Sequence, residues 1–513
     1  MLSLAFMCSR RLVSDHRSMC SALPLIPEEL YPLLFRAAFL DKKTLVLQDL
    51  VHRWPFSVLS LQRLLQGDGH HRSVQLFEKA NRLCVQTIIL GIMAYLKEEL
   101  ARQKQGQPLR KKRLRLLDMT GIHEDGLEQG PDTMSLWFRT VTLAKSCIDI
   151  AKRQSEETGQ VSKRRRGHLY AARSSVADSS TICVELRADL FVNSTSYAVL
   201  REALLVGNQG PLRLQCRDIR AEELSLGSTM GLLELLNPAS LRQIDLRFNN
   251  LGLPGLNALL PYMKRFSRLQ SLKLPYSNID VRRLSQVGEE DLQNFVSQIC
   301  QLSALKELNL GSSRLSGRLQ QLLRGLRTPL ESLELAFCYL LPADLYYLSQ
   351  SSHVSSLKKL DLSGNNLCDV LLQPFLQLLD CASTSLLHLD VMECKLTDSA
   401  LSALTPVLRR CRSLRYLGIF YNFLSGQGIR SLLQSSLHLA DLQLVIYPFP
   451  MECYLNPTMQ PDFSNPALDG CIDHGQVAGF QAELQEVLVR AQRTDMVWTA
   501  DMVLHRPPEY LSL

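Results

Sequence analysis

The sequence predicts an α/β fold in which short repeats, each adding one strand and one helix, stack into a solenoid. Three observations support this prediction. The chain has 513 residues, of which 46% are hydrophobic and 21% charged, so it can bury a large core. A leucine pattern returns seven times beyond residue 240, and apolar residues with helical spacing follow it. Neither a disordered chain nor a protein with several membrane spans fits this composition.

The leucine pattern defines the repeat. Residues 241–251 fill every position of the template LxxLxLxxNxL, which is typical of leucine-rich repeats. Recurrences 25 to 36 residues apart leave about 15 residues between motifs, enough for an outer helix. We therefore expect a leucine-rich-repeat solenoid with a curved parallel sheet inside and helices outside. The seven motifs start at Leu241, Leu269, Leu305, Leu330, Leu357, Leu386 and Leu414.

One position of each motif turns a small side chain toward the backbone. The two leucines of LxL point inward from a short strand, and the asparagine-type residue after them satisfies backbone groups at the following bend. Cysteine also suits this position in long repeats. The inward position holds Asn249, Ser277, Ser313, Cys338, Asn365, Cys394 and Asn422.

The residues beside the inward leucines predict the chemistry of the concave surface. We expect them to face solvent, and four of the seven that lie between the two leucines are acidic. An acidic ridge with an apolar end suits a basic or amphipathic helix of a partner protein. The alternative is that any soluble solenoid needs polar strand residues. The expected partner-binding residues are Asp245, Glu334, Asp361, Asp390, Met392, Tyr416 and Phe420.

Weaker patterns mark the ends of the solenoid. Residues 113–119 and 212–219 resemble irregular strands of the same kind. A degenerate eighth motif, Leu439-Leu442-Leu444, runs into prolines that should halt strand pairing, and residues 480–491 have the spacing of an amphipathic cap helix. The expected divisions are a helical N-terminal region (1–105), an irregular start of the solenoid (106–151), a flexible basic linker (152–181), irregular repeats (182–240), leucine-rich repeats (241–450) and a helical C-terminal cap (451–513).

Two N-terminal patterns resemble the docking boxes of cullin-2 ubiquitin-ligase receptors. In the first, three residues fall on one helical face, as an elongin-binding helix requires for insertion into an apolar groove. The second resembles the cullin-2 box, and the two follow each other in the right order. Ordinary helix packing gives the same spacing and stays open as the alternative. The expected elongin contacts are Leu4, Cys8 and Leu12, and the expected cullin-2 contacts are Ile26, Pro27, Leu30 and Leu34.

The positive charge is concentrated in the N-terminal third. Residues 1–180 hold 28 basic and 18 acidic residues, a net charge of +10, whereas the remainder carries −3. Two clusters, Arg110–Arg113 and Lys163–Arg166, account for much of it. They suggest nuclear import or nucleic-acid binding, with a solvated charge run as the plain alternative. The acidic concave surface would repel phosphate, which makes nucleic acid the weaker hypothesis.

The sequence gives no sign of catalysis or of a metal or cofactor site. Fourteen cysteines contain no CxxC pair, which predicts reduced thiols rather than a zinc module. Walker A, GxGxxG, HExxH and GxSxG motifs are absent, so we expect no enzyme and name no catalytic residue. No signal peptide or apolar stretch of membrane-spanning length occurs, which predicts a cytoplasmic protein, with a nuclear fraction if Lys163–Arg166 is read as an import signal.

Long segments across the chain are similar to the PRAME family of leucine-rich-repeat proteins. The resemblance implies non-enzymatic binding proteins, some of them substrate receptors of cullin-2 and elongin B/C ligases. For the most similar members it also implies cytoplasmic negative regulators of Toll-like-receptor signalling to NF-κB, which bind the beta subunit of the IκB kinase and hinder its assembly with the regulatory subunit. The segments are LPLIPEELYPLLFRAAFLDKK (23–43), LVHRWPF (50–56), SGRLQQLLRGLRTPLESLELAFC (316–338), YPFPMECY (447–454) and DMVWTAD (495–501).

Overall fold

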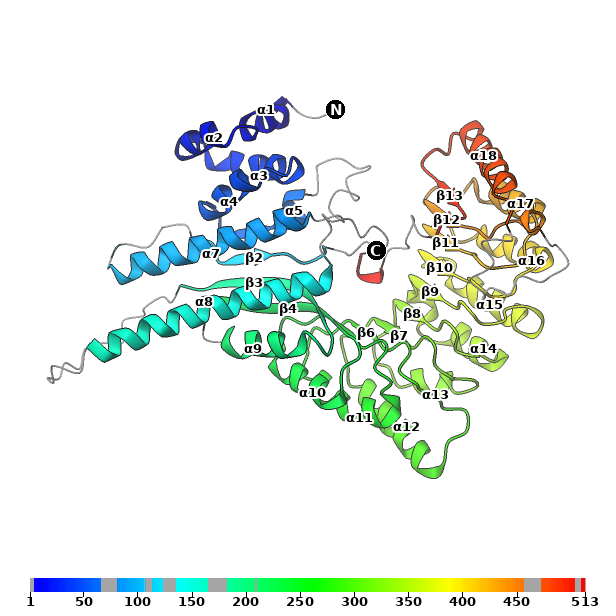
Figure 1. Cartoon of the computed structure of the whole chain (residues 1–513). Helices are drawn as coiled ribbons and strands as arrows, with labels where there is room; N and C mark the ends of the chain where they lie inside the picture. Colours follow the sequence, from blue (N-terminus) through cyan, green and yellow to red (C-terminus); the bar gives the residue numbers. More distant parts are fainter. Residues whose placement is uncertain are drawn as a thin grey trace. The chain divides into compact units, whose positions relative to one another are not determined.

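The structure divides into two compact units, Met1–Arg242 and Gln243–Leu513. Both are parts of one computed structural model, drawn from blue to red along the chain (Figure 1). In the described part of the chain, no helix combines the length and apolar character that a membrane span requires. The described residues are 4–65, 81–105, 107, 113–122, 135–164, 182–207, 210–455, 472–502 and 509–512.

The first unit joins a helical layer to four parallel strands. Strand β1 pairs with β2, β2 with β3 and β3 with β4, so strand order follows chain order. Strands β2 and β4 confirm the irregular strands expected at 113–119 and 212–219. The elements are α1 (Leu4–Val13), α2 (His16–Ala22), α3 (Tyr31–Leu40), α4 (Thr44–His52), β1 (Val58–Ser60), α5 (Leu61–Leu65), α7 (Arg82–Lys104), β2 (Leu116–Asp118), α8 (Leu136–Arg164), β3 (Val184–Val192), α9 (Tyr197–Gly207), β4 (Leu212–Ala221) and α10 (Leu226–Leu235).

Helix α8 corrects two expected boundaries. It occupies residues 136–151 of the expected irregular segment and continues to Arg164, so residues 152–164 of the expected flexible linker are helical. Lysine, arginine, glutamine and glutamate are frequent there and favour helix, so a polar segment without apolar periodicity need not be flexible. Of the basic cluster, Lys163 and Arg164 end this helix, whereas Arg165 and Arg166 lie outside the described residues.

The second unit is the leucine-rich-repeat solenoid that the sequence predicts. Strands β5 to β13 pair in parallel and in chain order. The helices run along the outer side of the strands (Figure 1). Each of β5 to β11 begins two residues after a predicted motif start, which confirms all seven motifs. The strands are β5 (Gln243–Asp245), β6 (Ser271–Lys273), β7 (Glu307–Asn309), β8 (Ser332–Glu334), β9 (Lys359–Asp361), β10 (His388–Asp390), β11 (Tyr416–Gly418), β12 (Leu444–Ile446) and β13 (Val497–Thr499).

The outer helices present an apolar face to the sheet. In α11, for example, Leu256, Leu259 and Leu260 are fully buried. Several helices begin at a serine or threonine whose side chain accepts a backbone N–H, as Ser285, Thr397 and Ser425 do. The helices are α11 (Gly252–Met263), α12 (Gln286–Ile299), α13 (Leu319–Leu323), α14 (Pro342–Gln350), α15 (Leu372–Ala382), α16 (Asp398–Leu408), α17 (Gly426–Ser436) and α18 (His474–Arg490).

The inward position works as predicted. Asn422 is 1% exposed, and its Nδ2 donates to the carbonyls of Val391 and Ile419 at 2.9 and 2.7 Å. Its Oδ1 accepts the backbone N–H groups of Cys394 and Leu396 at 3.0 and 2.9 Å. One side chain therefore joins two neighbouring repeats by satisfying four backbone groups that would otherwise be buried without partners.

The C-terminal end of the solenoid differs from the prediction. Val445 pairs with Leu417, so the eighth motif starts at Leu442 rather than Leu439. Pro448 and Pro450 do not stop the sheet, because they follow β12 and remove no donor from it. The predicted cap helix is α18, but β13 comes after it, so the segment 451–513 contains a ninth strand of this unit as well as a helix.

Removing the inward amide should destabilise the repeats. Asn422→Ala is expected to lower the free energy of unfolding by about 3 kcal/mol, because buried backbone groups lose their partners. Chemical denaturation of the purified chain measures it. Asn366→Ala is the control, since exposed Asn366 makes only one hydrogen bond, to the N–H of Cys368. Equal losses in the two variants would contradict the role of Asn422.

Candidate functional site

Charged side chains on the strands of the second unit form one interlocked array. Glu334 is its centre: Lys359 Nζ donates to its Oε1 at 3.2 Å, and Asn309 Nδ2 donates to its Oε2 at 2.9 Å. Lys273 Nζ lies 3.7 Å from Glu307 Oε1. Parallel pairing places Asn309 directly beside Glu334. The lysines reach acids two residues out of register, because neighbouring strands are only about 4.8 Å apart.

This array corrects the prediction of an open acidic ridge. Asp245, Glu334 and Asp390 are only 2%, 9% and 6% exposed, and Tyr416 and Phe420 are also buried. The predicted residues lie on one sheet, but long side chains from adjacent strands cover one another there. Among the seven, only Asp361 and Met392 are half-exposed. Whether any of them contacts a partner stays a prediction.

A second buried group lies at β10 and β11. His388 Nε2 is 2.7 Å from Asp390 Oδ2, and the Tyr416 hydroxyl donates to Asp390 Oδ1 at 3.0 Å. Burial lowers the pKa of His388, although its hydrogen bond to Asp390 opposes this. Gly418 makes room for the group, since a Cβ there would lie 2.0 Å from Asp390 Oδ1. The sequence pattern places Gly418 on the strand but gives no sign of this role.

Burial also decides which carboxyl groups carry charge. It raises the pKa of Glu307 to about 7 and that of Asp361 to about 7, and Asp390 raises the Asp361 pKa further. For Glu334 burial acts in the same direction, but Lys359 and Lys273 outweigh it and lower the pKa. Two lysines thus favour the ionised form of one acid, while burial moves the pKa values of two other acids close to neutral pH.

The C-terminal residues lie against this array, which the sequence did not suggest. Glu509 Oε2 is 2.9 Å from Lys273 Nζ, and the Tyr510 hydroxyl donates to Glu331 Oε2 at 2.9 Å. Glu331 also pairs with Lys306 and Lys358, which together with Tyr510 overcome its burial and lower its pKa to about 2. Part of the concave side is therefore covered by the chain itself.

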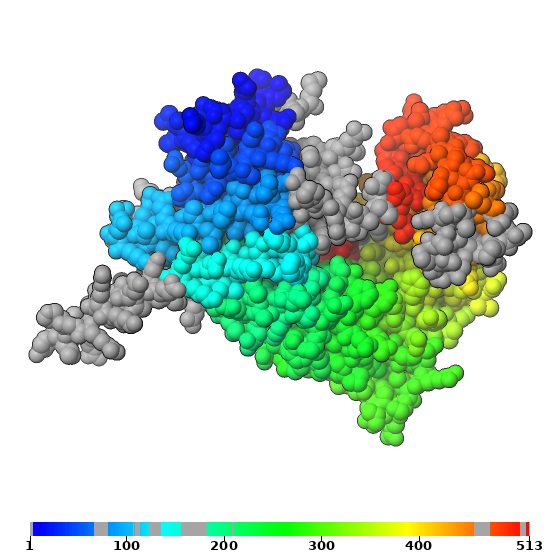
Figure 2. Space-filling model, in the orientation of Figure 1, coloured from blue at the N-terminus to red at the C-terminus, as the bar shows by residue number. Residues whose placement is uncertain are grey.

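Helix α1 of the first unit presents the predicted elongin contacts to solvent. Leu4 and Leu12 are 76% and 37% exposed, and Cys8 is exposed between them. The opposite face, with Phe6 and Val13, is buried. Atoms of this helix lie at the surface of the first unit (Figure 2). The structure therefore brings Leu4, Cys8 and Leu12 together as one apolar stripe, hereafter the α1 stripe.

Helix α1 is held in place by its polar neighbours. Arg10 Nη2 lies 2.6 Å from Asp41 Oδ1, beyond the end of α3. The Arg36 guanidinium lies 5.4 Å from the centre of the Phe6 ring. Both contacts connect α1 to α3 or to the turn after it. The stripe is thus displayed on a helix that is packed against the rest of its unit.

The predicted cullin-2 contacts are only partly accessible. Pro27 and Leu30 are exposed and Ile26 is half-exposed, but Leu34 is 2% exposed in the core. The prediction is therefore wrong for Leu34 as a contact residue. It sits in α3 on the face that packs inside the unit, together with Phe35 and Ala38, so its helical spacing reflects core packing.

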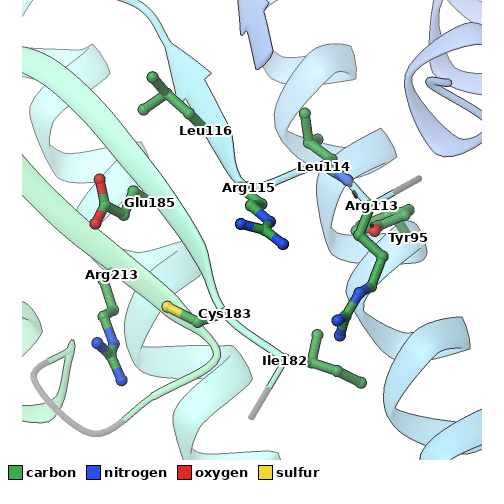
Figure 3. A pocket seen from close by; sticks show the side chains of 9 residues that line it. All are labelled: Tyr95, Arg113, Leu114, Arg115, Leu116, Ile182, Cys183, Glu185 and Arg213. Atoms are coloured by element: carbon green, nitrogen blue, oxygen red, sulfur yellow. Dashed lines mark hydrogen bonds between the residues drawn. The ribbon is translucent and has the colours of Figure 1, made fainter. Parts of the chain in front are cut away.

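A cleft in the first unit is lined by basic side chains. Figure 3 shows Arg113 and Arg115 before β2, Arg213 on β4 and Cys183 next to them. Glu185 is the one acidic residue of the lining. Such a cleft can hold an anion. Of the predicted basic cluster 110–113, only Arg113 lies within the described residues.

Three potential metal ligands meet between α2 and α4. Asp49 Oδ2 lies 2.8 Å from His16 Nε2 and accepts from Cys20 Sγ at 2.9 Å, and Sγ is 3.2 Å from Nε2. Hydrogen bonds within the trio satisfy these atoms. In the described part of the chain this is the group whose atoms lie close enough to hold a metal ion.

Known proteins match the chain along its whole length. Residues 2–86 match the PRAME N-terminal domain and residues 208–505 match the PRAME C-terminal domain. The chain belongs to the PRAME family. Leucine-rich repeat-containing protein 14 of Xenopus laevis is 64% identical over 516 residues, and its human counterpart is 45% identical over 514, each with 100% of both chains covered. The crystal structure of the leucine-rich repeat-containing protein LegL7 from Legionella pneumophila, with 14% identity and a TM-score of 0.28, covers 53% of this chain and 84% of its own.

The raised pKa of Asp361 should make the stability of this PRAME-family chain depend on pH. The ordinary aspartate pKa is about 4. Between that value and the pKa of about 7 in the fold, the folded state keeps a proton that the unfolded state has lost. This contribution to stability is complete below about pH 4 and is lost as the pH rises through about 7.

Asp361→Asn should therefore raise the free energy of unfolding by about 4 kcal/mol at pH 8 and by only about 1 kcal/mol at pH 5. Asparagine keeps the acceptor for the N–H of Ser363, which is 2.9 Å away. Denaturation curves at several pH values measure the effect, with Asp441→Asn on the exposed surface as the control. An equal shift at both pH values would contradict the assignment.

Proposed function

We propose that this PRAME-family chain is a non-enzymatic, protein-binding regulator. Its first unit docks to an assembly through the α1 stripe, and its repeat unit binds a target. The observation that supports this most directly is the exposure of Leu4, Cys8 and Leu12 on one face of α1. An apolar stripe on an otherwise anchored helix fits insertion into an apolar groove of a partner.

The α1 stripe favours a role as substrate receptor of a ligase containing cullin-2 and elongin B/C. Leu4, Cys8 and Leu12 are spaced four residues apart on one face of α1, in a segment that resembles an elongin-binding box. Exposed Pro27 and Leu30 follow along the chain, as a cullin contact would require. The buried Leu34 limits that second contact to the turn before α3.

A second candidate follows from the resemblance to regulators of Toll-like-receptor signalling. In it, the chain acts in the cytoplasm, binds the beta subunit of the IκB kinase and hinders its assembly with the regulatory subunit. The preformed repeat unit supports this role, because a rigid surface loses little ordering entropy when it occupies a partner. The acidic array contributes little to such binding, since its charges are buried and paired.

Mutation of the α1 stripe tests the docking role. The double change Leu4→Ala with Cys8→Ala should reduce co-purification of elongin C with the full chain at least about tenfold, because two exposed contacts are lost without disturbing the core. Leu90→Ala is the matched control, since Leu90 of α7 is 55% exposed in the same unit. Unchanged capture of elongin C by the double variant would refute the docking role.

The same variants separate the two candidate functions. Assembly of the IκB kinase beta subunit with the regulatory subunit is measured in a mixture of purified proteins without ubiquitination enzymes. If the chain acts by occupancy, wild type and the Leu4→Ala, Cys8→Ala variant should inhibit assembly equally. Absence of inhibition by the wild-type chain in this mixture would remove the second candidate and leave the ligase receptor.

A further inference from the structure

The turn after each of the strands β5 to β11 fixes one residue at positive φ. Its backbone N–H bonds to the next repeat, as Phe337 N does to the Ser363 carbonyl at 2.7 Å and Tyr276 N to that of Gly311 at 3.1 Å. This bond repeats along the sheet, so the conformation cannot relax in one repeat alone. The equivalent residues, with φ between 54° and 70°, are Phe248, Tyr276, Ser312, Phe337, Gly364, Glu393 and Tyr421.

Bulky aromatic residues are costly at such a position. The left-handed region brings the Cβ atom against the following carbonyl, and only glycine avoids this. Repeats with Ser312 and Gly364 show that the turn itself needs no ring. Nevertheless Phe248, Tyr276 and Phe337 occupy it, and they are 48%, 51% and 39% exposed. Neither the backbone nor core burial accounts for these rings.

Tyr339 extends this row. It lies two residues after Phe337, also at positive φ, and is 61% exposed. We call Phe248, Tyr276, Phe337 and Tyr339 the aromatic rim. Strained residues that contribute little to the core are typical of binding sites. Exposed aromatic side chains are likewise enriched where proteins bind proteins.

The ring faces of the aromatic rim are already occupied. Phe248 and Tyr276 stack on each other with centroids 4.6 Å apart. The Phe337 ring lies over Gly364, where a Cβ would be 2.1 Å from Cδ1. The Arg282 guanidinium lies 5.9 Å from the centre of Tyr339. What remains for a ligand is mainly ring edges, which suit aliphatic and aromatic side chains better than stacked nucleic-acid bases.

The charge beside the rim is positive. Arg282 and Arg314 both bond to Asp280, at 2.9 and 3.3 Å, so two cations share one carboxylate. Their side chains remain 40% and 54% exposed. The backbones of Asp280 and Arg314 also pair in an isolated parallel bridge, so this group connects the segments that follow β6 and β7. Arg282 places the group next to Tyr339, which follows β8. An acidic ligand would complement the excess charge.

We propose that the aromatic rim is a docking surface for an acidic segment of a partner protein that carries aliphatic or aromatic side chains. Its apolar side chains contact the ring edges, and its carboxylates pair with Arg282 and Arg314. The inference rests on the proposed protein-binding function and adds the surface and the chemistry of the target. It places target binding on the turns at the edge of the sheet instead of on the buried acidic array.

The test uses the full chain and a fluorescein-labelled peptide of glutamate, leucine and phenylalanine. Fluorescence anisotropy should show binding that Tyr276→Gly with Tyr339→Gly weakens at least about tenfold. Arg314→Glu should weaken it several-fold and reduce its salt dependence. Tyr346→Ala is the control, because Tyr346 of α14 is 43% exposed away from these turns. Equal binding by all variants would overturn the proposal.

Two further measurements distinguish a docking surface from structural rings and from a nucleic-acid site. Replacing the strained tyrosines by glycine should leave the unfolding midpoint unchanged or raise it, whereas a clear fall would show that the rings are structural. The same peptide with lysine in place of glutamate, and an oligothymidylate, should bind at least about tenfold more weakly. Tighter oligothymidylate binding would favour nucleic acid. Co-purification of elongin C through α1 should be unaffected, so failure at the rim is distinguishable from failure of docking.

Discussion

The second unit depends on one constraint: a repeat can bury its leucines only against the next repeat. Leu360 of β9 and Leu389 of β10 pair in register, and both are fully buried. Because this burial is the main favourable term for the fold, the register of neighbouring strands is fixed by it. Every other position of the repeat then lies beside its equivalent in the next one, whatever its chemistry.

That alignment has different consequences for the strand positions beside the leucines and for the turn positions after the strands. Next to the leucines it forces acids and lysines together, and they pair, bury one another and shift one another's pKa values. At the following turn it aligns aromatic side chains that do not pack into the core, and these stay exposed. Glu509 and Tyr510 cover part of the row of strand residues. Tyr276 and Tyr339, at the turns, face solvent. The turns and, in the first unit, the α1 stripe thus stay exposed to solvent.

The sequence predicted what depends on local periodicity. The seven motifs, the inward asparagines and the exposed face of α1 follow from spacing alone, and all are found. It did not predict the burial of Asp390, because burial there depends on His388 and Tyr416 of the same sheet. Strand β13 follows β12 only after a long interval without the motif, and no local pattern links Glu509 to Lys273. The role of Leu34 was misjudged because docking and core packing share one helical spacing.

The central claim is that stacking makes residues on the paired strands of adjacent repeats energetic neighbours. A double-mutant cycle on Asp390 of β10 and Tyr416 of β11, joined by a hydrogen bond of 3.0 Å, tests it most directly. The free energies of unfolding of Asp390→Asn, Tyr416→Phe and the double variant should reveal a coupling of about 1 kcal/mol or more. Single effects that add within about 0.3 kcal/mol would contradict the claim, because residues so placed could not then be in contact.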